Sequence, residues 1–172
     1  MPDQGNLQLF STLTYLALIF VSAIITVMGS MVLMVTFTRH RIQIKEEILR
    51  NRNIGMALIF SSFIWTLGNM CYEAVNPIMN VWYNRMATGF TLSSALSFFG
   101  GILGSLLSAL LIGAIAVYLS IKILMVINRD VKEWEEIKRS NIAVAIVFST
   151  TVIVVGMFFK SIIGFIVISI FE

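Results

Sequence analysis

The stretch that decides the fold spans residues 142–171 and reads IAVAIVFSTTVIVVGMFFKSIIGFIVISIF. It contains a single charged side chain, that of Lys160. A membrane-spanning helix needs roughly 20 consecutive, mostly apolar residues. This stretch therefore predicts one such helix, and similar apolar runs cover residues 12–37, 54–71 and 92–127.

The rest of the chain has the same character. Of its 172 residues 58% are hydrophobic and only 12% are charged, and the mean hydropathy is +0.93. A soluble domain carries about 25% charged residues, so this chain cannot cover a globule with polar surface. We predict an all-α integral membrane protein with four transmembrane helices, a single membrane domain over residues 1–172, for which the lipid bilayer is the solvent.

The basic residues gather in two loops and predict the orientation. Residues 38–53 carry Arg39, Arg41, Lys45, Arg50 and Arg52, and residues 128–141 carry Arg129, Lys132, Lys138 and Arg139. The loop between them, residues 69–91, offers only Arg85. Because cytoplasmic loops are enriched in Lys and Arg, both basic loops are expected in the cytoplasm. This predicts a multi-pass membrane protein with both termini outside the cytoplasm.

The N-terminal run is expected to stay in the mature protein. The first 38 residues contain no Lys or Arg, whereas a secretory signal begins with a positive stretch and ends at a cleavage site. The basic residues elsewhere lie between apolar runs, which gives no reason to expect a nucleic-acid partner.

The two basic loops and the helices after them match at an offset of 88 residues. Glu47 then falls on Glu135, Asn53 on Asn141, and the sequence Phe60-Ser61 on Phe148-Ser149. We interpret this match as an internal duplication, with repeat one over residues 12–71, repeat two over 92–160 and an apolar extension over 161–172. Two helical hairpins that enter the membrane in the same direction are parallel-topology repeats, related by an axis along the membrane normal.

Several positions in these repeats are candidates for polar contact or close packing. Asn53 and Asn141 stand where an inner loop becomes a helix, so each is either an N-cap or a polar contact at a pore or partner site. Small residues on one helix face allow close approach of helices or line a transport path, and packing is the preferred interpretation. The positions concerned are Ser61, Gly68, Ser149 and Gly156, together with two ridges on the third helix, Gly100/Gly104/Ser108 and Gly101/Ser105/Ala109/Gly113. Since one neighbour can hardly cover both ridges, either the third helix touches two neighbours within the bundle or one ridge faces a second subunit. We prefer the second alternative, which predicts a homo-oligomer.

Two charged residues, Glu73 near the end of the second apolar run and Lys160 in the fourth, each need a partner or water. Lys160 lies 19 residues after Asn141, and Glu73 lies 20 residues after Asn53, which puts both roughly 28–30 Å along their helices. Either the two side chains pair, or each is solvated separately at the outer surface; separate solvation is the favoured alternative. The only cysteine, Cys71, is expected close to the same surface and accessible to oxidants.

The sequence offers no recognisable chemistry for catalysis. No metalloprotease, hydrolase, P-loop or dinucleotide-binding motif is present, and one Cys with one His excludes a Cys/His zinc cluster. We therefore expect no catalytic residues, no metal, no cofactor and no enzyme activity. The inner loops, residues 38–53 and 128–141, carry short amphipathic patterns that suit either the membrane surface or a cytoplasmic partner.

The second basic loop and helix also carry the pattern of a known family. Glu135-Glu136-Ile137 is followed, after three polar residues, by Asn141 and an Ala-rich apolar helix. This resembles the YjfL-like family of small duplicated bacterial inner-membrane proteins, a domain of unknown function. The first copy departs from the pattern at Arg52 and Gly55.

The resemblance implies a four-helix inner-membrane protein with no catalytic residues to carry over. It also implies an association with envelope-stress systems. The leading hypothesis is an oligomeric, non-enzymatic protein that senses or maintains the envelope through partners; the alternative is an ion channel or small-solute transporter.

Overall fold

A computed structural model describes residues 4–37, 46–88, 92–128 and 133–171. Within these ranges the chain forms four long helices: α1 (Gln4–Phe37), α2 (Ile54–Thr88), α3 (Leu92–Ile127) and α5 (Ile142–Phe171). Two short helices precede α2 and α5, the π-helix η1 (Glu46–Arg50) and α4 (Glu133–Lys138). The expectation of an all-helical chain with four spans is confirmed for the part of the chain that the structure describes.

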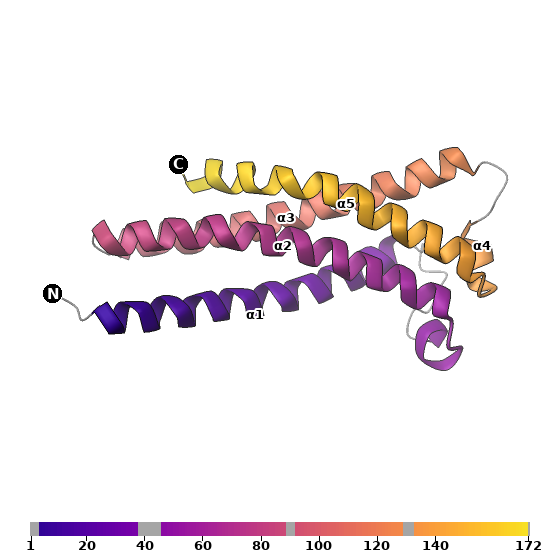
Figure 1. The fold of residues 1–172 in the computed structure, drawn as a ribbon, viewed down its shortest axis with the longest axis horizontal. Coiled ribbons are helices and arrows are strands. Elements are labelled where there is room, and N and C mark those ends of the chain that lie inside the picture. The colour runs from indigo at the N-terminus through magenta and orange to yellow at the C-terminus, as the bar shows by residue number, and fades with distance from the viewer. Residues whose placement is uncertain (1–3, 38–45, 89–91, 129–132, 172) are drawn as a thin grey trace.

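The long helices run up and down in a bundle. Figure 1 shows η1 and α4 together at one end and the two termini at the other. The central contact joins α2 and α5, which run side by side in the same direction, while α1 packs on α2 and α3 packs on both α2 and α5. Among the described residues, α1 and α5 make no substantial contact, and they lie on opposite sides of α2 (Figure 1).

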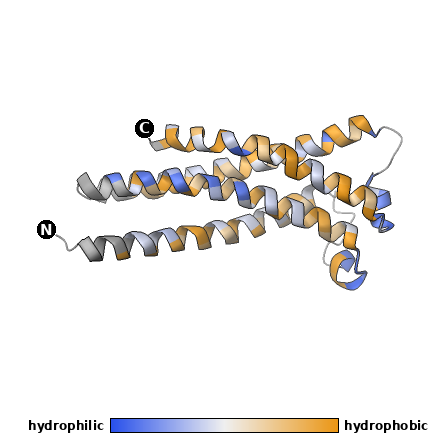
Figure 2. Cartoon of the chain, in the orientation of Figure 1, coloured by the Kyte–Doolittle hydropathy of each residue, from blue (hydrophilic) through white to orange (hydrophobic). Residues whose placement is uncertain are grey.

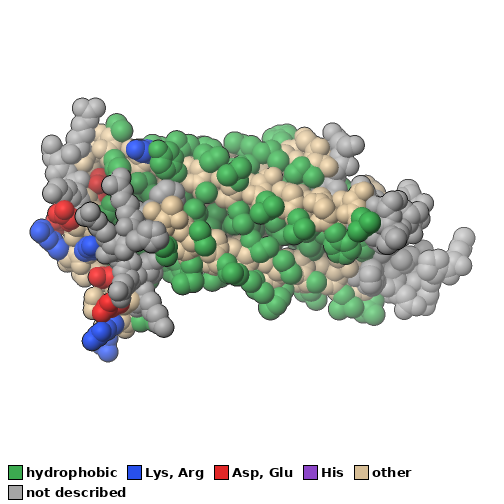
Figure 3. All heavy atoms as spheres, turned by 180° about the vertical axis from the view of Figure 1, so that it is seen from behind, with side chains coloured by type: hydrophobic (Ala, Val, Ile, Leu, Met, Phe, Trp, Pro, Cys, Tyr) green, Lys and Arg blue, Asp and Glu red, His purple; other side chains and the backbone are tan. Residues whose placement is uncertain are grey.

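Each long helix contains a segment that can cross a membrane. These segments are Ser11–Thr36, Ile54–Trp82, Leu96–Ile127 and Ile142–Ile170. Apolar side chains cover the middle of the bundle, and charged side chains gather at the end that carries η1 and α4 (Figure 3). By length and composition this is a multi-pass membrane protein.

The second span is longer than the sequence predicts. We expected a helix over 54–71 and a loop over 69–91, but α2 continues to Thr88 and includes Pro77. The apolar run does end near Cys71, yet a helix satisfies its own backbone hydrogen bonds wherever it lies, so polar side chains need not end it. The expectation of a loop over these residues is wrong for residues 69–88.

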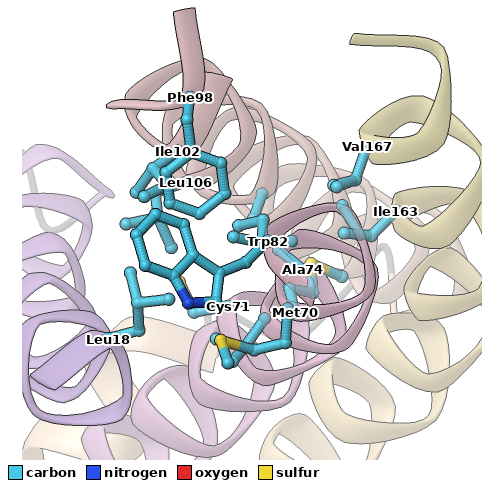
Figure 4. Packing of buried hydrophobic residues seen from close by; sticks show 14 of the residues in the cluster. Leu18, Met70, Cys71, Ala74, Trp82, Phe98, Ile102, Leu106, Ile163 and Val167 are labelled. Carbon is cyan, nitrogen blue, oxygen red and sulfur yellow. The ribbon is translucent and has the colours of Figure 1, made fainter. Parts of the chain in front are cut away.

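Trp82 shows what this extension does. The Trp82 side chain is only 4% exposed and packs against Phe98 of α3, with 4.7 Å between the ring centroids. Figure 4 shows the indole among Leu18, Phe98 and Leu106. The extended part of α2 therefore belongs to the hydrophobic core.

Cys71 is also part of this core rather than of the surface. Its thiol is buried, with 1% of the residue exposed, and it lies in the cluster that includes Met70, Ala74 and Ile163 (Figure 4). The expectation that Cys71 is accessible to oxidants is therefore wrong for the single chain, because α2 turns this side chain toward its own bundle.

The two small-residue ridges of α3 lie in different surroundings. The ridge Gly101/Ser105/Ala109/Gly113 is buried throughout, and a Cβ added at Gly113 would run into Leu67 of α2. In the other ridge Gly100 is exposed and Gly104 is partly buried, with only Ile170 near an added Cβ, at 4.0 Å. One ridge thus packs inside the bundle.

A Gly→Leu substitution is expected to affect the stability of the chain differently on the two ridges. Gly113→Leu is expected to destabilise the folded chain by about 1–3 kcal/mol, because the new side chain has to displace Leu67. Gly104→Leu is expected to leave the stability of the single chain close to wild type. Thermal unfolding of the purified variants in detergent measures the difference, and equal losses in both variants would contradict this assignment of the ridges.

Candidate functional site

Asn53 connects α2 to α4 at the end of the bundle that carries η1 and α4. Its Oδ1 accepts a hydrogen bond from the backbone N–H of Met56 at 3.1 Å, so Asn53 caps α2. Its Nδ2 donates across the bundle to the carbonyls of Ile137 at 3.0 Å and Lys138 at 3.3 Å. One buried side chain therefore both starts α2 and holds it against α4 of the second hairpin.

Asn141 also caps its helix, α5, but in the described structure its side chain bonds only to residues close to it in the chain. Its Oδ1 faces the N–H of Val144 at 3.4 Å, and its Nδ2 donates to Glu136 at 3.0 Å. The residues before the two asparagines match in conformation, with φ 52° at Arg52 and 62° at Ser140. Left-handed residues of this kind commonly end a helix, so each short helix stops and turns into the next long one in the same way.

The four small positions that match by sequence do not share one environment. Gly68 contacts Thr26 of α1, whereas Gly156 is buried against Thr66 of α2. Ser61 is exposed, whereas Ser149 is buried and its hydroxyl has no hydrogen-bond partner in the described structure. Gly156 marks a close approach of α2 and α5, where the Thr66 hydroxyl also donates to the carbonyl of Val152 at 3.4 Å.

Glu73 and Lys160 form an ion pair between α2 and α5. The Lys160 Nζ lies 3.0 Å from Glu73 Oε2, and the two side chains are 36% and 34% exposed, respectively. The favoured expectation of separate solvation is wrong, because parallel packing of α2 and α5 brings equivalent levels of the two helices together.

The pair lies well inside the two candidate spans. These spans continue to Trp82 and Ile170, about 14–15 Å beyond Glu73 and Lys160 along the helices. Because each span is longer than the roughly 30 Å of a hydrocarbon core, the expected position of the pair at the outer boundary stays a prediction. Charges inside a span are costly unless paired, which makes the pair a functional candidate by default.

Glu73 belongs to a polar face that sequence reasoning missed. Asn69, Glu73, Asn76 and Asn80 recur at spacings of four, three and four residues, which places them within about 60° of one helix face. We call these four residues the α2 polar face. All lie inside the span Ile54–Trp82, and Figure 2 shows hydrophilic residues along α2 where it runs between α1 and α5.

The α2 polar face points away from α3. Leu67, two residues before Asn69 and about 200° around the helix, contacts α3. Asn76 and Asn80 are exposed, and neither carboxamide has a hydrogen-bond partner in the described parts of the chain. Asn69 donates only to the carbonyl of Trp65 in its own helix, at 2.9 Å. The spacing was visible in the sequence, but it fell in residues assigned to a loop.

The site offers side chains for polar contacts. No group of three His, Cys, Asp or Glu side chains that could hold a metal ion occurs in the described ranges. The side chains of the site can form hydrogen bonds through their carboxamides, and they include one neutralised pair of charges, all within the candidate spans.

The two asparagine caps predict unequal costs for one substitution. Asn53→Ser keeps an N-cap oxygen but removes the donor to Ile137 and Lys138, and a cost of about 1–3 kcal/mol is expected for the lost buried hydrogen bonds. Asn141→Ser keeps the cap and loses only a partly exposed contact to Glu136, so a cost below about 1 kcal/mol is expected. Denaturation in detergent compares the two, and a larger loss for Asn141→Ser would overturn this account.

The ion pair predicts strong coupling between its two members. Lys160→Met leaves the Glu73 carboxylate without a counter-charge within the span, and Glu73→Gln leaves the Lys160 ammonium without one. Each single variant is therefore expected to cost about 1–3 kcal/mol. The double variant is expected to recover most of that loss. Additive losses in this double-mutant cycle would show that the two charges act independently.

Comparison with known proteins assigns the chain to a family by its sequence. Residues 7–163 match the family described as Domain of Unknown Function (DUF350). No curated protein and no solved structure matches the chain. Because the match covers nearly the whole bundle, from α1 to the part of α5 that carries Lys160, the chain belongs to the DUF350 family.

Proposed function

We propose that this protein is a non-enzymatic membrane protein that works as a homo-oligomer and acts through partners in sensing or maintaining the cell envelope. The observation that carries the proposal is the α2 polar face, whose Asn76 and Asn80 are exposed within the candidate span Ile54–Trp82. Lipid tails cannot hydrogen-bond to a carboxamide, whereas a neighbouring protein helix can. The envelope role comes from the resemblance to the YjfL-like family alone.

The exposed ridge of α3 is a second surface on which another subunit has room to pack. With Gly101/Ser105/Ala109/Gly113 packed inside the bundle, Gly100 and Gly104 remain open to a neighbour. Small residues allow helix backbones to approach closely, which is a main source of helix association where lipid is as apolar as the helices.

The end with η1 and α4 is the proposed docking site for a cytoplasmic partner, over residues 38–53 and 128–141. Leu49 on η1 is 69% exposed, although Ile137 on α4 is fully buried in the bundle. The apolar face of α4 thus packs on its own chain, and η1 supplies the available apolar surface in the described part of these loops.

The internal duplication is also proposed, and local geometry supports it. Arg52 and Ser140 have matching left-handed conformations before matching asparagine caps. The different surroundings of Gly68 and Gly156 fit two copies that have since diverged.

We propose that η1 and α4 face the cytoplasm of a bacterial inner membrane, with both termini outside. In a Cys71→Ser background, Lys45→Cys and Lys132→Cys are expected to resist a membrane-impermeant thiol reagent in intact cells and to react after permeabilisation. Labelling of either position from outside in intact cells would reverse the proposed orientation.

An ion channel or small-solute transporter is the second candidate. The Glu73–Lys160 pair and the adjoining carboxamides favour it, since polar and charged groups within a membrane often mark a solute path. This function requires the polar faces of several subunits to surround water.

The two candidates differ in a measurement on purified protein. Native mass analysis in mild detergent is expected to show an oligomer, and liposomes containing the protein are expected to show no ion flux above that of empty liposomes. A flux that Ser149→Ala or Asn76→Leu alters would establish the channel instead. A monomer at all protein concentrations would refute the oligomeric function.

A further inference from the structure

We infer that a second copy of this chain docks on the α2 polar face, with α2 against α2 across a twofold axis along the membrane normal. This inference rests on the proposed oligomer and specifies its interface. It concerns the side of the bundle where α2 runs between α1 and α5 (Figure 1).

The chemistry of the face suits a copy of itself. A carboxamide carries two donors and an acceptor, so Asn76 and Asn80 can each donate to and accept from the same residue type. Two copies inserted in the same orientation place Asn76 and Asn80 at the same depth in the membrane. A twofold axis then brings each residue opposite its own counterpart, which is the defining property of an isologous interface.

The charges on the face are compatible with this arrangement. A lone Glu73 near a twofold axis would face another Glu73 and repel it. Here Lys160 neutralises Glu73 within the same chain, at 3.0 Å, so two copies meet as neutral surfaces.

The helices on either side complete the interface. Within the described chain α1 and α5 do not pack on each other, although α2 packs on both. A twofold axis in front of α2 places α1 of one copy beside α5 of the other. The contact that is missing within one chain is then made between two chains.

The outer half of α5 has room for such a contact. Phe165 is 76% exposed, and a Cβ added at the adjacent Gly164 would meet no atom within 4 Å. An exposed aromatic beside a glycine gives an approaching α1 both apolar surface and space.

The α3 ridge is the main competing surface for a second copy. Gly104 lies nine residues before Gly113, which contacts α2, so it faces the opposite side of α3. Lipid tails can cover glycines without loss of a hydrogen bond, whereas they leave Asn76 and Asn80 without partners. For this reason we assign the twofold interface to α2.

Cysteine crosslinking of the full chain in native membranes tests the assignment. In a Cys71→Ser background, Asn76→Cys and Asn80→Cys are each expected to give a disulfide-linked dimer on mild oxidation, which a reductant reverses. The matched control is Gly104→Cys, on the opposite side of α3, and it is expected to stay monomeric on a denaturing gel.

A second measurement separates the interface from folding. The double variant Asn76→Leu/Asn80→Leu is expected to raise the dissociation constant of the oligomer by about tenfold or more in detergent, since two polar contacts per chain are lost. Its thermal unfolding as a monomer is expected to match wild type, because both positions are exposed. Thr150→Leu, at an exposed position near the other end of α5, serves as the control for adding an apolar side chain.

The outcomes distinguish this inference from the proposed function. Disulfide-linked dimers of the variants at positions 76 and 80, with no dimer of the variant at position 104, support the inference. An oligomer that crosslinks only at position 104, or at none of the three, overturns the α2 interface and leaves the oligomeric function standing. A monomer in native mass analysis overturns both.

Discussion

Hydrogen bonding in a solvent that offers no partners is the constraint on which the rest of this structure depends. Inside a bilayer every backbone N–H and carbonyl has to be satisfied by protein, which limits the described chain to long helices and places its turns at the ends. The same constraint applies to side chains. Ser22, Thr26 and Ser30 lie buried on α1 and each donates to a carbonyl of its own helix, at 2.7–2.8 Å.

Against that background, the contact between α2 and α5 organises the bundle. The two helices meet where side chains are small, at Gly55 against Ala145 and at Thr66 against Gly156. This close approach brings Glu73 within reach of Lys160, and at the other end it brings Asn53 within reach of the carbonyls beside Ile137. The ion pair and the buried asparagine are therefore consequences of one packing arrangement.

The α2 polar face differs from the hydroxyls buried along α1. Buried hydroxyls along α1 return to their own backbone, whereas Asn76 and Asn80 have no partner in the described chain and point away from it. An exposed carboxamide in water needs no explanation, but at membrane depth it requires a neighbouring protein surface or water. This residue pattern connects the fold to an assembly.

The sequence by itself determined the class of protein, the four apolar runs, the starts of α2 and α5 at their asparagine caps, and the family. These features depend on composition and on residues close together in the chain, such as Asn53 and Met56. It did not determine that α2 continues through residues 69–88, because hydropathy falls there while the helix is held by packing, as at Trp82 against Phe98. Only the tertiary structure decided that Glu73 pairs with Lys160, that Cys71 is buried, and that Asn53 reaches the second hairpin. Those facts depend on which faces of distant helices meet. In a chain composed mostly of apolar residues, the faces that meet are determined by the shapes of residues such as Thr66 and Gly156.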